Sequence, residues 1–261
     1  MGNDSSKPPG AQGKRSIGIR LKSGPSSATV QRHLENATKS RVLQLKSCGL
    51  KLVPEQLSEV CEILRNLDLS DNRIRVLPEL IGSFTNLKQL HLSGNQLEEL
   101  PDEVGLLKKL EVLNASRNLL ASLPEGFVGL CSLKVLNLSG NKLVTMPIAV
   151  CRLQSLDNLD MSANLLETLP DEVKDLKASE VNFNQNRLNS LNENLARCER
   201  LKILRVEENC LNRRDFSPEL LSNSNISLIA YAGNLFQDKD FQSLPGYEDY
   251  QARFTATKRK M

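Results

Sequence analysis

Few side chains in this sequence have the types and spacing that catalysis needs. Only two histidines are present, His33 and His91. Asp68, His91 and Ser93 supply the three groups of a hydrolytic triad, but no motif orients them as one. The six cysteines form no CxxC pair, and no cluster has the spacing of metal ligands. The sequence therefore predicts no catalytic, metal or cofactor site.

The first six residues carry a motif for a different chemistry, covalent lipidation. They read M-G-x-x-x-S, so removal of Met1 would expose Gly2 to N-myristoylation. One myristoyl chain binds a bilayer only marginally, with a constant on the order of 10⁴ M⁻¹. Nearby basic residues could supply a second signal of about 1 kcal/mol each at an anionic surface. These residues are Lys7, Lys14, Arg15, Arg20 and Lys22. The alternative is an ordinary solvated terminus.

Charge is distributed unevenly along the chain. Residues 1–26 hold five basic residues against one acidic residue, a net charge of +4, and Lys258 to Lys260 add +3. Because the whole chain carries +3, the remainder carries −4. A nucleic-acid-binding domain more often has a basic stripe along its folded part, so we expect no nucleic-acid partner. We interpret residues 1–26, which are rich in Gly, Pro, Ser and Lys, as a disordered basic tether.

Eight asparagines recur at intervals of 22 to 25 residues through most of the chain. They are Asn72, Asn95, Asn118, Asn141, Asn164, Asn186, Asn209 and Asn234. The same frame surrounds each of them, for example Leu64-x-x-Leu67-x-Leu69-x-x-Asn72-x-Ile74. This frame and this period are the signature of leucine-rich repeats, which stack into a solenoid.

The repeat predicts an α/β fold, a right-handed leucine-rich-repeat solenoid. Alternation of apolar and polar residues before each asparagine predicts a short strand, and we expect about nine strands in one parallel, concave sheet. Leu-Pro pairs such as Leu77-Pro78 predict short helical or 3₁₀ segments on the convex side. Each asparagine amide is expected to satisfy backbone groups in its own turn and in the next unit. Cys48 replaces it in the first unit.

Four segments follow from these patterns. The tether at 1–26 precedes a cap helix at 27–39, where Val30, Leu34 and Ala37 have helical spacing. The repeat array is expected over 40–236, and a C-terminal cap with a basic tail over 237–261. The Leu-Pro pair is missing towards the end of the array, so we expect an irregular outer loop near 212–225.

The repeats resemble the intracellular leucine-rich-repeat class that includes the plant Ras-group-related repeat proteins and the Ras-binding repeat scaffolds. The segments Arg205 to Leu211 and Arg253 to Lys258 add to this resemblance. It implies a membrane-associated interaction protein without catalytic residues. A soluble regulator of a small Ras-like GTPase or of a phosphatase complex is the alternative.

Location follows from what the sequence lacks. No apolar signal segment opens the chain, and no run of 18 apolar residues occurs. The cysteines do not cluster at the two ends of the array, where extracellular repeat proteins usually have disulfides. We therefore expect an intracellular protein with reduced thiols, a monomer held at the cytoplasmic side of a membrane by its lipid.

A protein partner is expected on the concave face. In each unit the residue between the second and third leucines points to solvent, and neighbouring rows add further candidates. The predicted binding residues are Asp68, His91, Val112, Asn114, Val135, Asn137, Asp160, Asn182, Arg205 and Glu207. Val112 and Val135 are the apolar members, of the kind that form hot spots. The alternative is that the serines two positions after this row, such as Ser70 and Ser116, only complete the turns by bonding local backbone.

Overall fold

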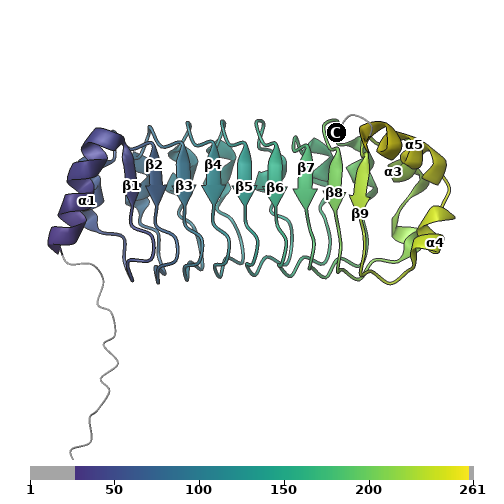
Figure 1. Cartoon of the computed structure of the whole chain (residues 1–261), viewed down its shortest axis with the longest axis horizontal. Coiled ribbons are helices and arrows are strands. Elements are labelled where there is room, and N and C mark those ends of the chain that lie inside the picture. Colours follow the sequence, from purple (N-terminus) through teal and green to yellow (C-terminus); the bar gives the residue numbers. More distant parts are fainter. Residues whose placement is uncertain (1–26, 259–261) are drawn as a thin grey trace, which may run out of the picture.

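The computed structural model describes residues 27–258 as one elongated stack of repeats (Figure 1). Gly2, the other residues of the proposed tether at 1–26, and the end of the tail at 259–261 lie outside the described residues. Within the described range, none of the helices combines the length and the apolar composition that a membrane crossing requires.

Nine short strands form a single sheet, and their order in the sheet is their order in the chain. They are β1 (Val42–Gln44), β2 (Asn66–Asp68), β3 (Gln89–His91), β4 (Val112–Asn114), β5 (Val135–Asn137), β6 (Asn158–Asp160), β7 (Glu180–Asn182), β8 (Ile203–Arg205) and β9 (Leu228–Ala230). All neighbours pair in parallel with equivalent residues in register, as in Leu67↔Leu90. The prediction of a nine-stranded parallel sheet is confirmed.

Short 3₁₀ segments and helices connect the strands. The 3₁₀ segments are η1 (Glu55–Val60), η2 (Glu79–Ser83), η3 (Asp102–Leu106), η4 (Glu125–Gly129), η5 (Asp171–Asp175), η6 (Glu193–Arg197) and η7 (Arg213–Asp215). The α-helices are α1 (Ser27–Ser40), α2 (Ile148–Cys151), α3 (Pro218–Ser222), α4 (Asp238–Gln242) and α5 (Tyr247–Lys258). Proline precedes the segment in six repeats, as Pro78 does before η2, so this prediction is also confirmed.

The expectation of an irregular loop near 212–225 is wrong. This segment holds η7 and α3, each with its own capping residue. Asn212 and Asp215 form a reciprocal capping box at η7, and the Ser217 hydroxyl accepts from the Leu220 amide at the start of α3. Polar caps therefore start both segments where the Leu-Pro pair is missing, and Pro218 stands at the first position of α3, directly after its cap.

A continuous row of leucines forms the spine of the core. Leu67, Leu90, Leu113, Leu136 and Leu159 are fully buried at the centre of successive strands. The apolar residue three positions after each proline, such as Val104 or Phe127, is buried and closes the core from the convex side. No repeat can bury its own apolar side chains alone, because these are covered by the apolar side chains of the neighbouring repeats.

The repeated asparagines fasten each turn from inside, as Asn118 illustrates. Its Nδ2 donates to the carbonyls of Ala115 and Ser116 in its own turn, both at 3.1 Å, and to that of Leu92 at 3.0 Å. Its Oδ1 accepts from the Leu97 amide at 3.0 Å. Asn118 is only 4% exposed, so these backbone groups could not be hydrated in its place.

The direction of this bonding corrects the expectation from the sequence. Leu92 and Leu97 belong to the preceding repeat, and the same holds for Leu45 and Leu50, which Asn72 contacts. The asparagines therefore couple backwards and not to the next unit. This direction explains why Cys48 is sufficient in the first repeat, where no earlier repeat needs the bonds. Within residues 27–258 the Cys48 thiol donates to the nearby Lys46 carbonyl alone.

Both ends of the stack are covered. Helix α1 buries Val30, Leu34 and Ala37 and packs against β1 and η1. At the other end an aromatic cluster covers the last repeat. Its members are Phe216, Tyr231, Phe236, Phe241, Tyr247, Tyr250 and Phe254. The Tyr250 hydroxyl accepts from the Ile229 amide, and the Arg253 guanidinium donates to three carbonyls around α3.

Replacing Asn118 by alanine tests the inner bonding. Asn118→Ala leaves the Leu97 amide without its acceptor and removes one of two donors from each of the three carbonyls. We expect a loss of about 2–5 kcal/mol in the free energy of unfolding. Asn158→Ala is the matched control, because the Asn158 side chain makes no hydrogen bond within residues 27–258. It should change stability by less than about 0.5 kcal/mol. Urea unfolding measures both, and equal effects would contradict the assignment.

Candidate protein-binding face

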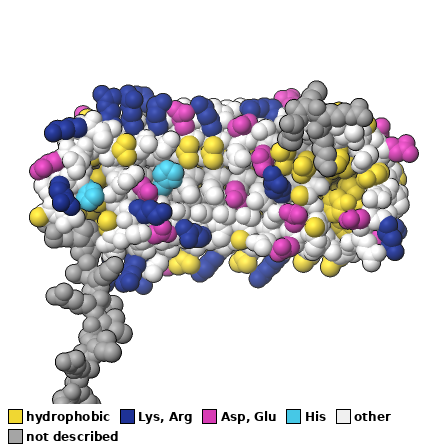
Figure 2. Space-filling view, in the orientation of Figure 1, with side chains coloured by type: hydrophobic (Ala, Val, Ile, Leu, Met, Phe, Trp, Pro, Cys, Tyr) yellow, Lys and Arg dark blue, Asp and Glu magenta, His cyan; other side chains and the backbone are white. Residues whose placement is uncertain are grey.

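The predicted binding residues lie along one face of the sheet. Nine of the ten are half-exposed, and Val135 is exposed. Seven of them stand in one register row across neighbouring strands from β2 to β8: Asp68, His91, Asn114, Asn137, Asp160, Asn182 and Arg205. Since parallel strands are about 4.8 Å apart, this row presents one side chain at each such step. Figure 2 looks onto this face.

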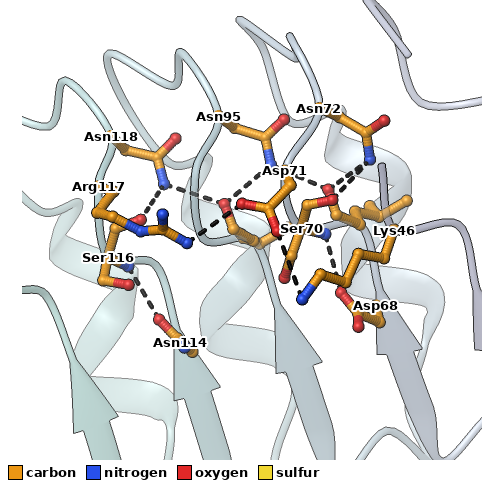
Figure 3. A network of polar contacts seen from close by, with 12 residues as sticks. Lys46, Asp68, Ser70, Asp71, Asn72, Asn95, Asn114, Ser116, Arg117 and Asn118 are labelled. Carbon is orange, nitrogen blue, oxygen red and sulfur yellow. Dashed lines mark hydrogen bonds and ion pairs between the residues drawn. The ribbon is translucent and has the colours of Figure 1, made fainter. Parts of the chain in front are cut away.

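Most of this row also holds the turns that follow the strands. Asp68 Oδ1 accepts from the Ser70 amide at 2.9 Å, and Asn114 Oδ1 accepts from the Ser116 amide at 3.1 Å (Figure 3). Equivalent bonds are made by Asn137, Asp160 and Asn182. The side chains that seemed free for a partner from the sequence therefore satisfy local backbone with one oxygen. The alternative reading assigned this role to the serines.

One polar atom of each side chain remains for a ligand. The Nδ2 groups of Asn114, Asn137 and Asn182 make no hydrogen bond to any of the described residues. Each can donate two bonds outward, while the second oxygens of Asp68 and Asp160 can accept. The turn bond also fixes the side-chain rotamer, so these groups are held ready at little further entropic cost.

The predicted residues nearer the C-terminus are already engaged. Arg205 donates to Glu180 Oε1 with Nε at 3.1 Å and with Nη2 at 2.7 Å. Glu207 accepts from Asn184 Nδ2 at 2.7 Å, and its own amide donates to Asn184 Oδ1. These pairs join the β7 and β8 repeats across the face. Arg205 and Glu207 therefore offer a protein partner fewer available polar atoms than the row from β4 to β6 does.

A second polar network lies at the end of the strands in the first repeats. Asp71 forms an ion pair with Lys46 at 3.4 Å and accepts a hydrogen bond from Arg117 at 3.2 Å (Figure 3). Arg117 reaches it across an intervening repeat, in which Gly94 has a φ of +67°. A Cβ at Gly94 would lie 2.5 Å from Asp71 Oδ1. Asp71 and Arg117 hold the same left-handed turn in the neighbouring repeats, so it is the room left for the ion pair that favours glycine at this position.

Three charged residues that the sequence reading missed lie at the opposite edge, just before the strands. Glu111 accepts from Lys88 at 2.8 Å and from Lys134 at 2.9 Å. Hydrogen bonds and charge from these two lysines lower the pKa of Glu111 from 4.5 to about 2. The sequence did contain a signal for this cluster, because all three residues occupy the same position of successive repeats, immediately before the strand.

Groups for catalysis are not assembled on this face. Asp68 spends one oxygen on the Ser70 amide, and His91 has no hydrogen bond to Asp68 or Ser93 within residues 27–258. Burial raises the pKa of both Cys151 and Cys198 to about 12, so neither thiol is a ready nucleophile near neutral pH. None of the six cysteines is in a disulfide. No group of metal-binding side chains is assembled within the described range.

Comparison with known proteins agrees with this geometry. A model for a leucine-rich repeat region matches residues 24–139, and a second leucine-rich-repeat model matches residues 132–153. A leucine-rich-repeat protein of Leptospira interrogans is similar in structure, with a TM-score of 0.68 and 28% identity over 82% of this chain. A TDR receptor follows, with a TM-score of 0.64 and 27% identity over 74% of this chain.

The chain is therefore a leucine-rich-repeat protein, and proteins of this kind generally serve as surfaces for binding other proteins. Neither matching model describes a catalytic domain. The chain spans 62% of the length of the Leptospira protein and 34% of the TDR receptor. Internalin C2 of Listeria monocytogenes shares the fold alone, with a TM-score of 0.61 at 22% identity over 74% of this chain and 80% of its own.

The lysine pair around Glu111 gives a titration that can be measured. Because the folded pKa lies below 4.5, this carboxylate contributes stability above pH 4.5 and loses it as the pH falls towards about 2. Carboxyl-carbon NMR should give a midpoint near 2 in the wild type and a higher midpoint in Lys134→Gln. Lys142→Gln, an exposed lysine at the other edge of the same repeat, should not move it. An unchanged midpoint in Lys134→Gln would refute the assigned cause.

Proposed function

We propose that this protein is a non-catalytic adaptor that binds a protein partner on its concave face and is held at the cytoplasmic side of a membrane by myristoylated Gly2. The observation that carries the binding part is the row of outward amide and carboxylate groups from β4 to β6, fixed in place by bonds to their own turns. Beside it, Val112 and Val135 offer apolar surface.

The membrane part rests on the sequence. The motif around Gly2 and the basic residues of 1–26 supply the two signals that stable attachment requires. The segments Arg205 to Leu211 and Arg253 to Lys258 also resemble leucine-rich repeat-containing protein 57, and this resemblance implies a membrane-associated interaction protein. The competing proposal is a soluble regulator of a Ras-like GTPase or phosphatase complex, in which Gly2 has no role.

Charge and bulk placed in the row should abolish partner binding. We expect Asn137→Arg combined with Asp160→Arg to lose the protein that the wild type captures from cells, since both arginines stand where a partner must approach. Asn189→Arg with Asp175→Arg makes the same change of residue types away from this face. That control should retain the partner. Capture that is equal in both double variants would show that binding occurs elsewhere.

Removing the acyl acceptor should release the protein from membranes. We expect Gly2→Ala to lose incorporation of labelled myristate and to move to the soluble fraction, while Asn3→Ala, which preserves the motif, behaves as the wild type. Proximity labelling from both variants compares their neighbours. If Gly2→Ala keeps the location and neighbours of the wild type, the soluble regulator is the better proposal.

A further inference from the structure

Three lysines form a rim at the edge of the sheet where β3 to β5 begin. This lysine rim consists of Lys88, Lys109 and Lys134, all exposed. They line an open depression of about 330 Å³ together with Glu111, Ser132 and Ser155. Figure 2 shows Lys and Arg side chains following the upper edge of the molecule, above the strands of the half nearer α1.

The rim retains positive charge after its internal contacts are made. Glu111 is the one carboxylate that lines the depression, and it is shared by Lys88 and Lys134. Lys109 donates to the neutral Asn86 side chain at 2.6 Å. Three ammonium groups against one carboxylate leave a net charge of +2. Each ammonium has three N–H donors, so each lysine can bind a further acceptor.

Apolar and amide groups continue directly from the rim onto the concave face. Val112 follows Glu111 in the chain, Val135 follows Lys134, and the two valines are register partners. Val135 is 37% exposed. Asn114 and Asn137 stand two residues further on, with outward amide donors. From the edge inward, a ligand would therefore meet cations, then methyl groups, then N–H donors.

We propose that the lysine rim and the Val112–Val135 step form one docking site for an acidic segment of a partner protein, with carboxylates on the lysines and a bulky apolar side chain on the valines. This inference rests on the proposed function and specifies its partner. The asparagine amides then donate to carbonyls of the bound segment. Glu111 occupies the lysines in the free protein and competes with the incoming carboxylates.

The combination of cations, methyl groups and amide donors favours a protein segment over a lipid surface as the ligand. Exposed ion pairs contribute little individually and are screened by salt, so the lysines need the apolar contact for useful affinity. A bilayer can meet the edge of the sheet. The valines and amides lie on the face of the sheet, however, and one flat surface does not cover both edge and face. A peptide chain can bend from the rim onto the face.

A labelled synthetic peptide of alternating glutamate and leucine tests the site by fluorescence anisotropy on the full chain. Lys88→Glu with Lys134→Glu should weaken binding by at least about tenfold, because attraction becomes repulsion. Val135→Thr, nearly the same shape but polar, should weaken it several-fold. Glu111→Gln should strengthen it, because the competing carboxylate is lost. Lys142→Glu, the same type of substitution at the opposite edge of the β5 repeat, should have little effect, and Lys134→Glu alone is its matched comparison.

The controls separate the possible failures. A peptide of glutamate and serine should bind clearly less tightly, and phosphatidylserine vesicles should not compete. Equal binding of both peptides, weakening by Glu111→Gln, or capture by vesicles with the same lysine dependence would each overturn the proposal. If the peptide fails while the Asn137/Asp160 double variant still loses its cellular partner, the concave face binds a protein of other chemistry and only this inference fails.

Discussion

The backward bond of each repeated asparagine is the constraint on which the rest of this structure depends. One buried amide closes its own turn and supplies both a donor and an acceptor to the repeat before it, as Asn118 does for Leu92 and Leu97. Coupling therefore runs from one repeat to the next and in one direction. Stability in such a stack is close to a sum over repeats and their interfaces, so damage to one asparagine is felt first by that repeat and the one before it.

The same turn limits what the concave face can offer. The backbone after each strand must enter the left-handed region, as at Asp71, Arg117 and Gly140, and its amides need acceptors. The buried asparagine serves the inside, and the Asp or Asn at the end of the strand serves the outside. That position is therefore polar for structural reasons in most repeats. Positions just before the strand and at its first residue are less constrained, and Lys88, Lys134 and the valines occur there.

The sequence was sufficient to predict every structural feature that follows from the repeat period. The strands, their parallel register and the proline-led segments such as η2 each need only a local pattern repeated many times. Contacts between repeats were harder to predict. The shared repeat position of Lys88, Glu111 and Lys134 indicated that these residues are neighbours. Which of them pair, and the reach of Arg117 over Gly94 to Asp71, depend on side-chain rotamers that no local pattern specifies. The helical start at Ser217 was missed because its proline, Pro218, follows a polar cap and stands in a different place from the Leu-Pro pairs of the other repeats.

Contacts between repeats also determine where a partner has most to gain. At β7 and β8 the polar side chains of the face already bond one another, in the pairs Arg205–Glu180 and Glu207–Asn184. A ligand would have to replace these bonds with bonds of equal quality. At the first repeats Asp71 is held by two cations. The aromatic cluster covers the far end. Between them, at β4 and β5, fixed donors that have no partner among residues 27–258 lie beside exposed methyl groups, so binding there costs the protein few existing interactions. A partner that engaged the C-terminal strands instead would need to supply its own replacement for each broken pair.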